Sequence, residues 1–137
     1  MVAEFKKPEE SFPTKGLRRP FLEIMEDFAK PVPRRFLKSK RLKNSEITFV
    51  PWYNYIKLLN FYSPGFQWSC QVKQIGERTV VEGRLTILAE EGSFSQMATG
   101  TEENDVDSYG DPSSNAEAMA LRRCCAKFGL SLDLWAK

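Results

Sequence analysis

The chain has 137 residues, enough for one domain with a hydrophobic core. No apolar run reaches the roughly 20 residues of a membrane span, and the absence of histidine removes the commonest general base and zinc ligand. With no phosphate-binding loop or nucleophile elbow either, we expect no enzyme, cofactor or metal site. Three cysteines, two of them adjacent, and a polar N-terminus predict a cytoplasmic protein without disulfides.

The net charge of +2 conceals a marked segregation of charge. Residues 30–43 (KPVPRRFLKSKRLK) carry seven cations and no acid, which leaves 13 basic and 18 acidic residues elsewhere, a net charge of −5. Many of the acids gather in one loop, at Glu102, Glu103, Asp105, Asp107 and Asp111. Such segregation favours a directed electrostatic surface over a uniformly solvated one.

In chain order, a flexible tail over residues 1–20 precedes a single domain over residues 21–137. A short amphipathic helix over 20–29 is followed by Pro31 and Pro33, which end it. The basic segment after them is expected to be a loop or a partly extended arm. A second helix starts at Pro51 and ends at Ser63-Pro64-Gly65, with one apolar stripe formed by Trp52, Tyr55, Ile56, Leu59 and Tyr62.

The hydrophobic period then changes from that of a helix to that of strands. Residues alternate between apolar and polar over 66–73, and two further strands are expected over 78–90 and 93–102, separated by turns at Gly76-Glu77 and Glu91-Gly92. Sequential strands joined by short turns form an antiparallel meander.

The last helix is the best-defined element. An S-x-x-E capping box at Ser114 and Glu117 is expected to begin it, and Gly129 ends it. One side of this helix carries the residues expected to pack on the sheet, namely Ala118, Ala120, Leu121, Cys124, Cys125 and Phe128. Packing of that side would hold Arg122, Arg123 and Lys127 on the other side, facing solvent. The fold class is therefore α+β: a three-stranded antiparallel meander packed against a C-terminal helix, with one or two helices before it.

Taken together, these motifs resemble the Rad-fifty-two-type single-strand annealing proteins and their bacterial relatives, the DNA damage response protein A (DdrA) group. The resemblance covers residues 36–135. It consists of a helix leading to a Gly-x-x-Trp strand start (Gly65 to Trp68), a meander, a Tyr-Gly loop (Tyr109-Gly110), and a helix with a Leu-Arg-Arg step that ends in Phe-Gly (Leu121 to Arg123, Phe128-Gly129).

This resemblance implies a homo-oligomeric ring that holds single-stranded DNA in a basic groove with the bases outward, and that anneals strands during recombination and double-strand-break repair. By position in the motif, the groove cations are Arg122 and Arg123, joined by Lys127. The other wall is expected from the basic arm: Lys38, Lys40, Arg41, Lys43, Arg34 and Arg35. The resemblance also implies a nucleoid-associated location and recombinase or nuclease partners, and no membrane is expected.

Several alternatives remain open. In the simplest interpretation the cations of the last helix form a solvated face, and the basic segment is a solubilising linker. The aromatic residues form a core and not a base-stacking platform, except that Tyr53 and Phe61 fall off the apolar stripe. The acidic loop is a candidate divalent-metal site or a surface that repels DNA or meets a neighbour's basic arm. Alternative functions are a double-stranded or structured RNA-binding module, or a structural assembly subunit that binds an acidic partner.

Overall fold

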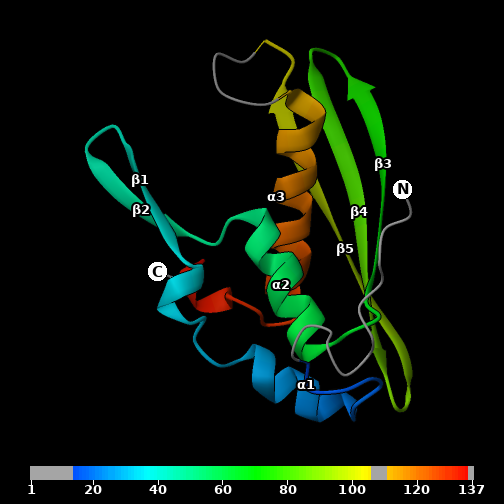
Figure 1. Ribbon diagram of the computed structural model, residues 1–137. Helices are drawn as coiled ribbons and strands as arrows, with labels where there is room; N and C mark the ends of the chain where they lie inside the picture. The colour runs from blue at the N-terminus through cyan, green and yellow to red at the C-terminus, as the bar shows by residue number, and fades with distance from the viewer. Residues whose placement is uncertain (1–13, 106–110, 136–137) are drawn as a thin grey trace, which may run out of the picture.

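A computed structural model describes residues 14–105 and 111–135. It has the predicted α+β architecture, with a three-stranded sheet, a long C-terminal helix and helices before them (Figure 1). In chain order the elements, with η denoting 3₁₀-helices, are α1 (Phe21–Phe28), η2 (Arg34–Phe36), β1 (Lys38–Leu42), β2 (Ser45–Phe49), α2 (Trp52–Tyr62), β3 (Gln67–Ile75), β4 (Arg78–Ala89), β5 (Gly92–Glu103), α3 (Pro112–Lys127) and η3 (Leu132–Leu134). Within the described part of the chain, no helix is long and apolar enough to cross a bilayer.

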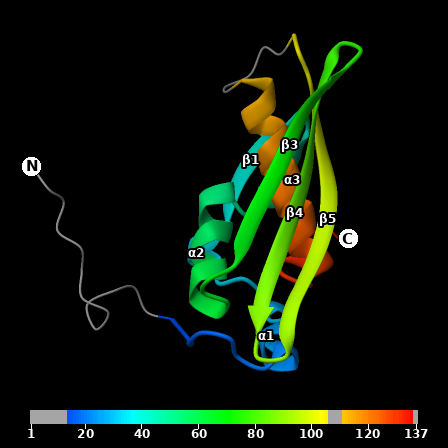
Figure 2. The ribbon, with the colours of Figure 1, turned by 90° about the vertical axis from the view of Figure 1, so that its right-hand side faces the viewer.

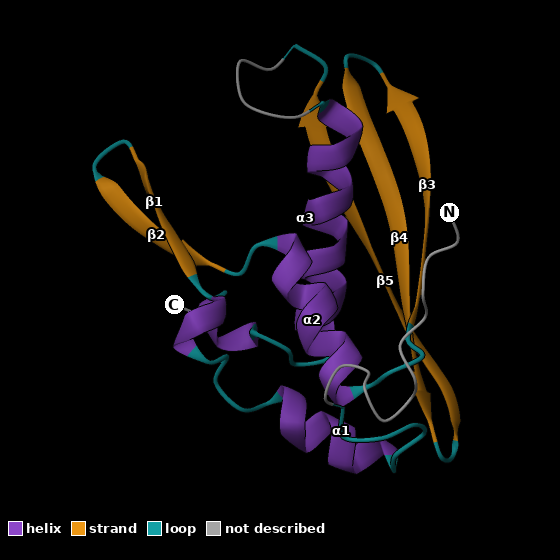
Figure 3. Ribbon diagram, viewed as in Figure 1, coloured by secondary structure: helices purple, strands orange, loops and turns teal. Residues whose placement is uncertain are grey.

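The predicted meander is present as an antiparallel sheet of order β3-β4-β5. Its central strand alternates strictly: every second residue from Thr79 to Ala89 is buried, including Val81, Leu85 and Ile87, and the others are more exposed. The buried face is covered by α3, and α2 lies on the same side of the sheet (Figures 2 and 3). Because both neighbours of β4 are strands of the same sheet, β3 and β5 are left as its two edges.

Small residues allow α3 to approach the sheet closely. A Cβ added at Gly100 of β5 would overlap the backbone of α3 at Ala116 and Ala120. Cys124 and Cys125 are fully buried on the same side of the helix, which confirms them as small core residues. The packed side of α3 is therefore fixed by backbone contact and by side-chain burial together.

The start of α3 differs from the predicted capping box. Asp111 is the N-cap: its carboxylate accepts a hydrogen bond from the backbone N–H of Ser114, and Pro112 occupies the first turn. Ser114 and Glu117 therefore lie inside the helix, and the Glu117 carboxylate instead accepts a hydrogen bond from the indole N–H of Trp68 at 2.8 Å. The end of the helix is as predicted, because Gly129 follows it in a left-handed conformation with φ +99°.

The second helix has nearly the predicted bounds and packs through Tyr55, Leu58 and Leu59, all of which are buried. The prediction that Trp52 belongs to this apolar stripe is wrong, because its side chain is 53% exposed. Trp52 is the first residue of α2, so the helix reaches the core only one turn later.

The basic segment after α1 is more ordered than the expected loop or arm. Arg34–Phe36 form η2, and Lys38–Leu42 pair with Ser45–Phe49 in an antiparallel hairpin that forms a sheet of its own. Lys43 makes the turn with a positive φ of 54°. At its base the hairpin is joined to α2, where the Asn54 side-chain amide donates to the Phe36 carbonyl at 3.0 Å.

The described chain begins at Thr14, so residues 1–13 of the expected tail lie outside the described residues. The next residues are held against α1, where the buried Asp27 carboxylate accepts hydrogen bonds from Arg19, Lys15 and Lys30. Burial alone would raise the pKa of Asp27, but these three cations outweigh it and lower the pKa to about 2. Arg19 is itself only 8% exposed and also donates to the Tyr62 carbonyl at 2.8 Å. Through Arg19 the N-terminal segment is thus joined to Asp27 on α1 and to Tyr62 on α2.

Candidate nucleic-acid interface

The nine cations predicted to contact DNA fall into separate groups on the structure. Strand pairing places Lys38 opposite Phe49 and Lys40 opposite Ile47, so both lysines lie on the hairpin face that also carries Leu42. Arg41 lies on the other face of the hairpin, and Lys43 lies at its tip. The remaining members belong to η2 (Arg34 and Arg35) and to α3 (Arg122, Arg123 and Lys127).

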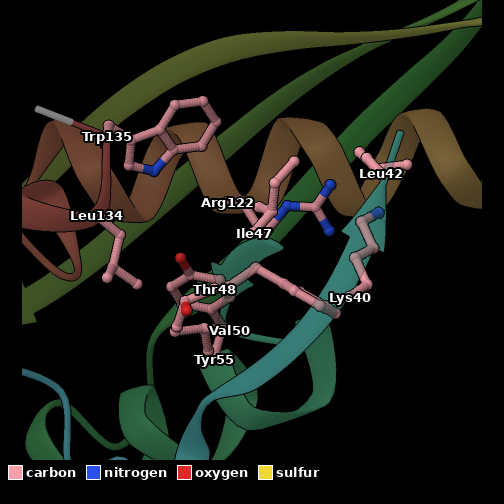
Figure 4. A pocket seen from close by; sticks show the side chains of 10 residues that line it. Lys40, Leu42, Ile47, Thr48, Val50, Tyr55, Arg122, Leu134 and Trp135 are labelled. Carbon is pink, nitrogen blue, oxygen red and sulfur yellow. The ribbon is translucent and has the colours of Figure 1, made fainter. Parts of the chain in front are cut away.

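The hairpin face that carries Lys40 looks onto α3 across a pocket of about 290 Å³. We call this the hairpin pocket; it is lined by Lys40, Leu42, Ile47, Thr48, Phe49, Val50, Tyr55, Arg122, Leu134 and Trp135. Figure 4 shows Arg122, Lys40 and Leu42 on one side of it and Leu134 with Trp135 on the other. The hairpin pocket thus brings together cations from residue 40 and residue 122, which the sequence analysis had placed on opposite walls of a groove.

Arg122 is partly buried at this pocket. Its burial, together with the neighbouring charge of Arg123, lowers the pKa of the Arg122 guanidinium, although an arginine keeps its charge at neutral pH. None of the ion pairs among the described residues involves Arg122, Lys38 or Lys40. A half-desolvated charge without a carboxylate beside it gains more from an external anion than a fully hydrated charge does.

Two aromatic rings, one on α2 and one at the base of the hairpin, contact the hairpin lysines. The Lys38 ammonium lies 5.5 Å from the centre of the Tyr53 ring, and the Lys40 ammonium lies 5.2 Å from that of Phe49. Cation–π contacts at such distances restrain a flexible side chain while leaving its donors available to a ligand. Tyr53, which falls off the apolar stripe of α2, therefore has a role beside the cationic face.

Tyr55, which lines the pocket, is buried, and its hydroxyl shares a 2.5 Å hydrogen bond with the Ser131 hydroxyl. Burial, which outweighs this hydrogen bond, raises the pKa of Tyr55 to about 12. Tyr55 is therefore neutral across the physiological range. Its hydroxyl fixes the segment from which Leu134 and Trp135 project.

The prediction that Arg122, Arg123 and Lys127 share one side of α3 is wrong. Arg123 donates to the Thr99 carbonyl at 3.1 Å and Lys127 to the Met97 carbonyl at 2.6 Å, so both reach the free edge of β5. Arg122 projects instead toward the hairpin, because consecutive helix positions are about 100° apart. Arg122 therefore lies on a different side of α3 from Arg123 and Lys127.

The cations of η2 lie at a third place. The Arg35 guanidinium stacks over Phe36 at 4.7 Å, and Arg35 lines a mainly apolar pocket with Pro33 and Phe61, beside the second half of α2. Arg34 and Arg35 are therefore not part of the hairpin pocket. Their assignment to DNA stays a prediction, as do those of Arg41, Lys43, Arg123 and Lys127.

The acidic cluster is only partly placed. Asp111 caps α3, and Glu103 forms an ion pair with Arg78 at 3.5 Å. Asp107 and the Tyr109-Gly110 step lie outside the described residues. Among the residues that are placed, no group of three or more acidic or cysteine side chains is arranged to hold a metal ion.

The second strand of the hairpin was not predicted from the sequence, and neither were two residues that line the pocket, Leu134 and Trp135. Trp135 is 49% exposed although it follows a 3₁₀-turn whose neighbour Leu130 is buried. No sequence signal marked Trp135, because an aromatic residue beyond the last helix would ordinarily be expected to pack inward.

Comparison with known proteins yields two relatives from Arabidopsis thaliana. "DNA repair RAD52-like protein 1, mitochondrial" is 33% identical over 132 residues, covering 93% of this chain and 74% of the relative. "DNA repair RAD52-like protein 2, chloroplastic" is 36% identical over 128 residues, covering 88% of this chain and 63% of that relative. No family model matches the chain.

Proposed function

The chain belongs to the family of RAD52-like DNA repair proteins, and we propose that in DNA repair and recombination it binds single-stranded DNA and anneals complementary strands. The observation that carries the proposal is the meeting of Lys40 and Arg122 at the hairpin pocket, with Lys38 on the same hairpin face. The family membership agrees with the resemblance found in the sequence, while kinship with the bacterial DNA damage response protein A group stays a prediction.

The phosphates of a bound strand would lie along the hairpin face and contact Lys38, Lys40 and Arg122. Each contact replaces condensed counterions on the strand, which is the main source of affinity in sequence-independent binding. Neutralised phosphates also repel a second, complementary backbone less strongly. Annealing then needs no catalytic group, so we propose a binding protein and not an enzyme.

We propose a ring-shaped homo-oligomer as the working form. The β3 edge of the three-stranded sheet has no strand partner within the described chain, and an unpaired edge strand is a template for pairing with another copy. On β3 the side chains of Val72 and Ile75 are exposed, as suits residues that become buried on assembly. A ring would also multiply weak contacts along one strand. Size-exclusion chromatography with light scattering, with and without oligo-dT, tests this assembly; a monomer in both conditions would contradict it.

The strand-binding proposal is tested by the salt dependence of oligo-dT affinity. If each protomer contacts about three phosphates, log K falls with log salt at a slope of about −2 per protomer, and Lys40→Ala or Arg122→Ala should bring it to about −1.4. Arg84→Ala is the matched control, because Arg84 is exposed on the sheet face opposite α3 and contacts Met97 at 3.8 Å. Slopes unchanged in Lys40→Ala and Arg122→Ala would remove the hairpin pocket from the interface.

Competition separates this function from its alternatives. Stronger retention of duplex RNA than of single-stranded DNA would favour the RNA-binding module, and a stable oligomer that retains neither at low salt would favour the assembly subunit. A nuclease assay with magnesium or manganese tests the proposed absence of catalysis. The cytoplasmic location expected from the sequence stays a prediction, since the two relatives are named as organellar proteins.

A further inference from the structure

The hairpin pocket contains more than a phosphate contact needs. Beside the two cations it has an apolar wall, formed by Trp135 and Leu134 on the η3 side and by Ile47 and Leu42 on the hairpin side. Three of these four large apolar side chains, Trp135, Leu42 and Ile47, are between 38% and 49% exposed. A purely electrostatic groove would not require such a surface, because phosphate oxygens gain nothing from an indole ring.

The backbone that carries Trp135 is held by hydrogen bonds within its own segment. The Trp135 N–H donates to the Leu132 carbonyl at 3.0 Å, and the Leu134 N–H to the Ser131 carbonyl at 3.0 Å. Ser131 stands in a left-handed conformation with φ 63° and is held there by its buried bond to Tyr55. Because the backbone at Trp135 is already ordered, the segment loses little freedom when a ligand stacks on the indole.

The two sides of the pocket together define the ligand by chemistry. One side presents the charges of Arg122 and Lys40, and no carboxylate among the described residues is paired with either. This side is suited to bind an anionic group. The other side presents an exposed indole flanked by aliphatic groups and calls for a flat, weakly polar ring. A nucleotide joins these two groups at a short, fixed separation.

We propose that the hairpin pocket takes one nucleobase of each protomer's bound strand, stacked on Trp135, with the adjoining phosphate at Arg122 and Lys40. This inference rests on the proposed function and refines it, because it turns one base per protomer inward while the others stay open to pairing. Stacking on an aromatic side chain is tolerant of base identity. The pocket therefore adds affinity without sequence preference, and the captured base has to leave it before it can pair.

The test compares oligo-dT with an oligonucleotide of equal length and phosphate count in which every base is replaced by an abasic site. Fluorescence anisotropy should show that the unaltered protein binds oligo-dT roughly 5- to 150-fold more tightly per stacked base. Trp135→Ala should lose this preference while keeping its affinity for the abasic strand, and Trp135→Phe should retain part of it. Circular dichroism on each variant verifies the fold.

Trp52→Ala is the matched control, because Trp52 is also half-exposed but does not line the pocket. It should keep the preference for oligo-dT. Adding oligo-dT should quench tryptophan fluorescence in the unaltered protein and in Trp52→Ala, and should not do so in Trp135→Ala. Annealing per bound strand should be at least as fast in Trp135→Ala as in the unaltered protein, because no base has to leave the pocket.

The outcomes separate the two proposals. If the unaltered protein binds neither strand, the proposed function itself fails. If it binds both strands and Trp135→Ala keeps the full preference for oligo-dT, strand binding stands and the base pocket is overturned. Loss of the preference in Trp52→Ala but not in Trp135→Ala would likewise overturn it.

Discussion

The buried carboxylate of Asp27 should make a large and pH-dependent contribution to stability, which Asp27→Asn will expose. Asp27 accepts hydrogen bonds from three cations, of which Arg19 is buried with it. Removing one partner of a buried ion pair costs about 3–5 kcal/mol, because the other charge is left without compensation. Urea denaturation at pH 7 should therefore show a loss of that size.

The pH dependence follows from the lowered pKa of Asp27. A carboxyl whose pKa is lower in the folded state stabilises the protein fully above its unfolded pKa of 3.8, and this stabilisation disappears as the pH falls through about 2. The difference of nearly two units corresponds to about 2 kcal/mol. The gap in unfolding free energy between the unaltered protein and Asp27→Asn should thus shrink by about that amount between pH 6 and pH 2.

A matched control is available on the same helix. Glu26 is exposed and next to Asp27, so Glu26→Gln removes a carboxylate without disturbing the cluster and should change stability by less than about 0.5 kcal/mol at any of these pH values. A gap for Asp27→Asn that stays constant from pH 6 to pH 2 would contradict this prediction, because the pKa of Asp27 would then not be lowered in the folded state.

Two further substitutions test the packing that positions the interface. Gly100→Ala should destabilise the protein by about 1–3 kcal/mol, since the new Cβ meets the backbone of α3 at Ala116; Thr99→Ala, at an exposed neighbouring position, should change the urea midpoint little. Tyr55→Phe should cost about 1–3 kcal/mol, because it leaves the buried Ser131 hydroxyl without its partner. Thermal unfolding measures this loss, and an unchanged midpoint would show that the hydroxyl pair contributes nothing.

The parts of the fold that could be predicted are those whose side chains contact the core. The meander was predictable because β4 alternates between buried and more exposed residues, which is the period of a half-buried strand. The C-terminal helix was predictable from its small apolar residues and from Gly129. Its N-terminus was misplaced because S-x-x-E recurs by chance, whereas the Asp111-Pro112 step also satisfies the rules for an N-cap followed by proline.

The hairpin could not be predicted for a physical reason. All five residues of β1 and the first three of β2 are exposed, and the alternation at Ile47 and Phe49 of β2 is too short to mark a strand while β1 has no alternation. Its turn is Lys43-Asn44, and the positive φ falls on Lys43, a position at which glycine or asparagine would be the usual signal. The sequence therefore indicated which segment carries the cations, but not which face of the hairpin each cation occupies.

The candidate site was predictable in composition more than in geometry. Arg122 and Lys40 were both named from the sequence, and the pocket brings them together. The separation of Arg122 from Arg123 follows from the helix period alone and could have been anticipated. The role of Trp135 could not, because its exposure depends on how η3 folds back beside α3.

The hairpin forms a separate two-stranded sheet, and no ladder hydrogen bond ties it to the sheet under α3. Its tip projects away from the body, so the hairpin pocket is flanked by a free-standing arm (Figure 1). A DNA strand can then enter from the side, between the hairpin and α3, and need not be threaded in from one of its ends. We accordingly expect covalently closed single-stranded circles to be bound as readily as linear strands of the same length.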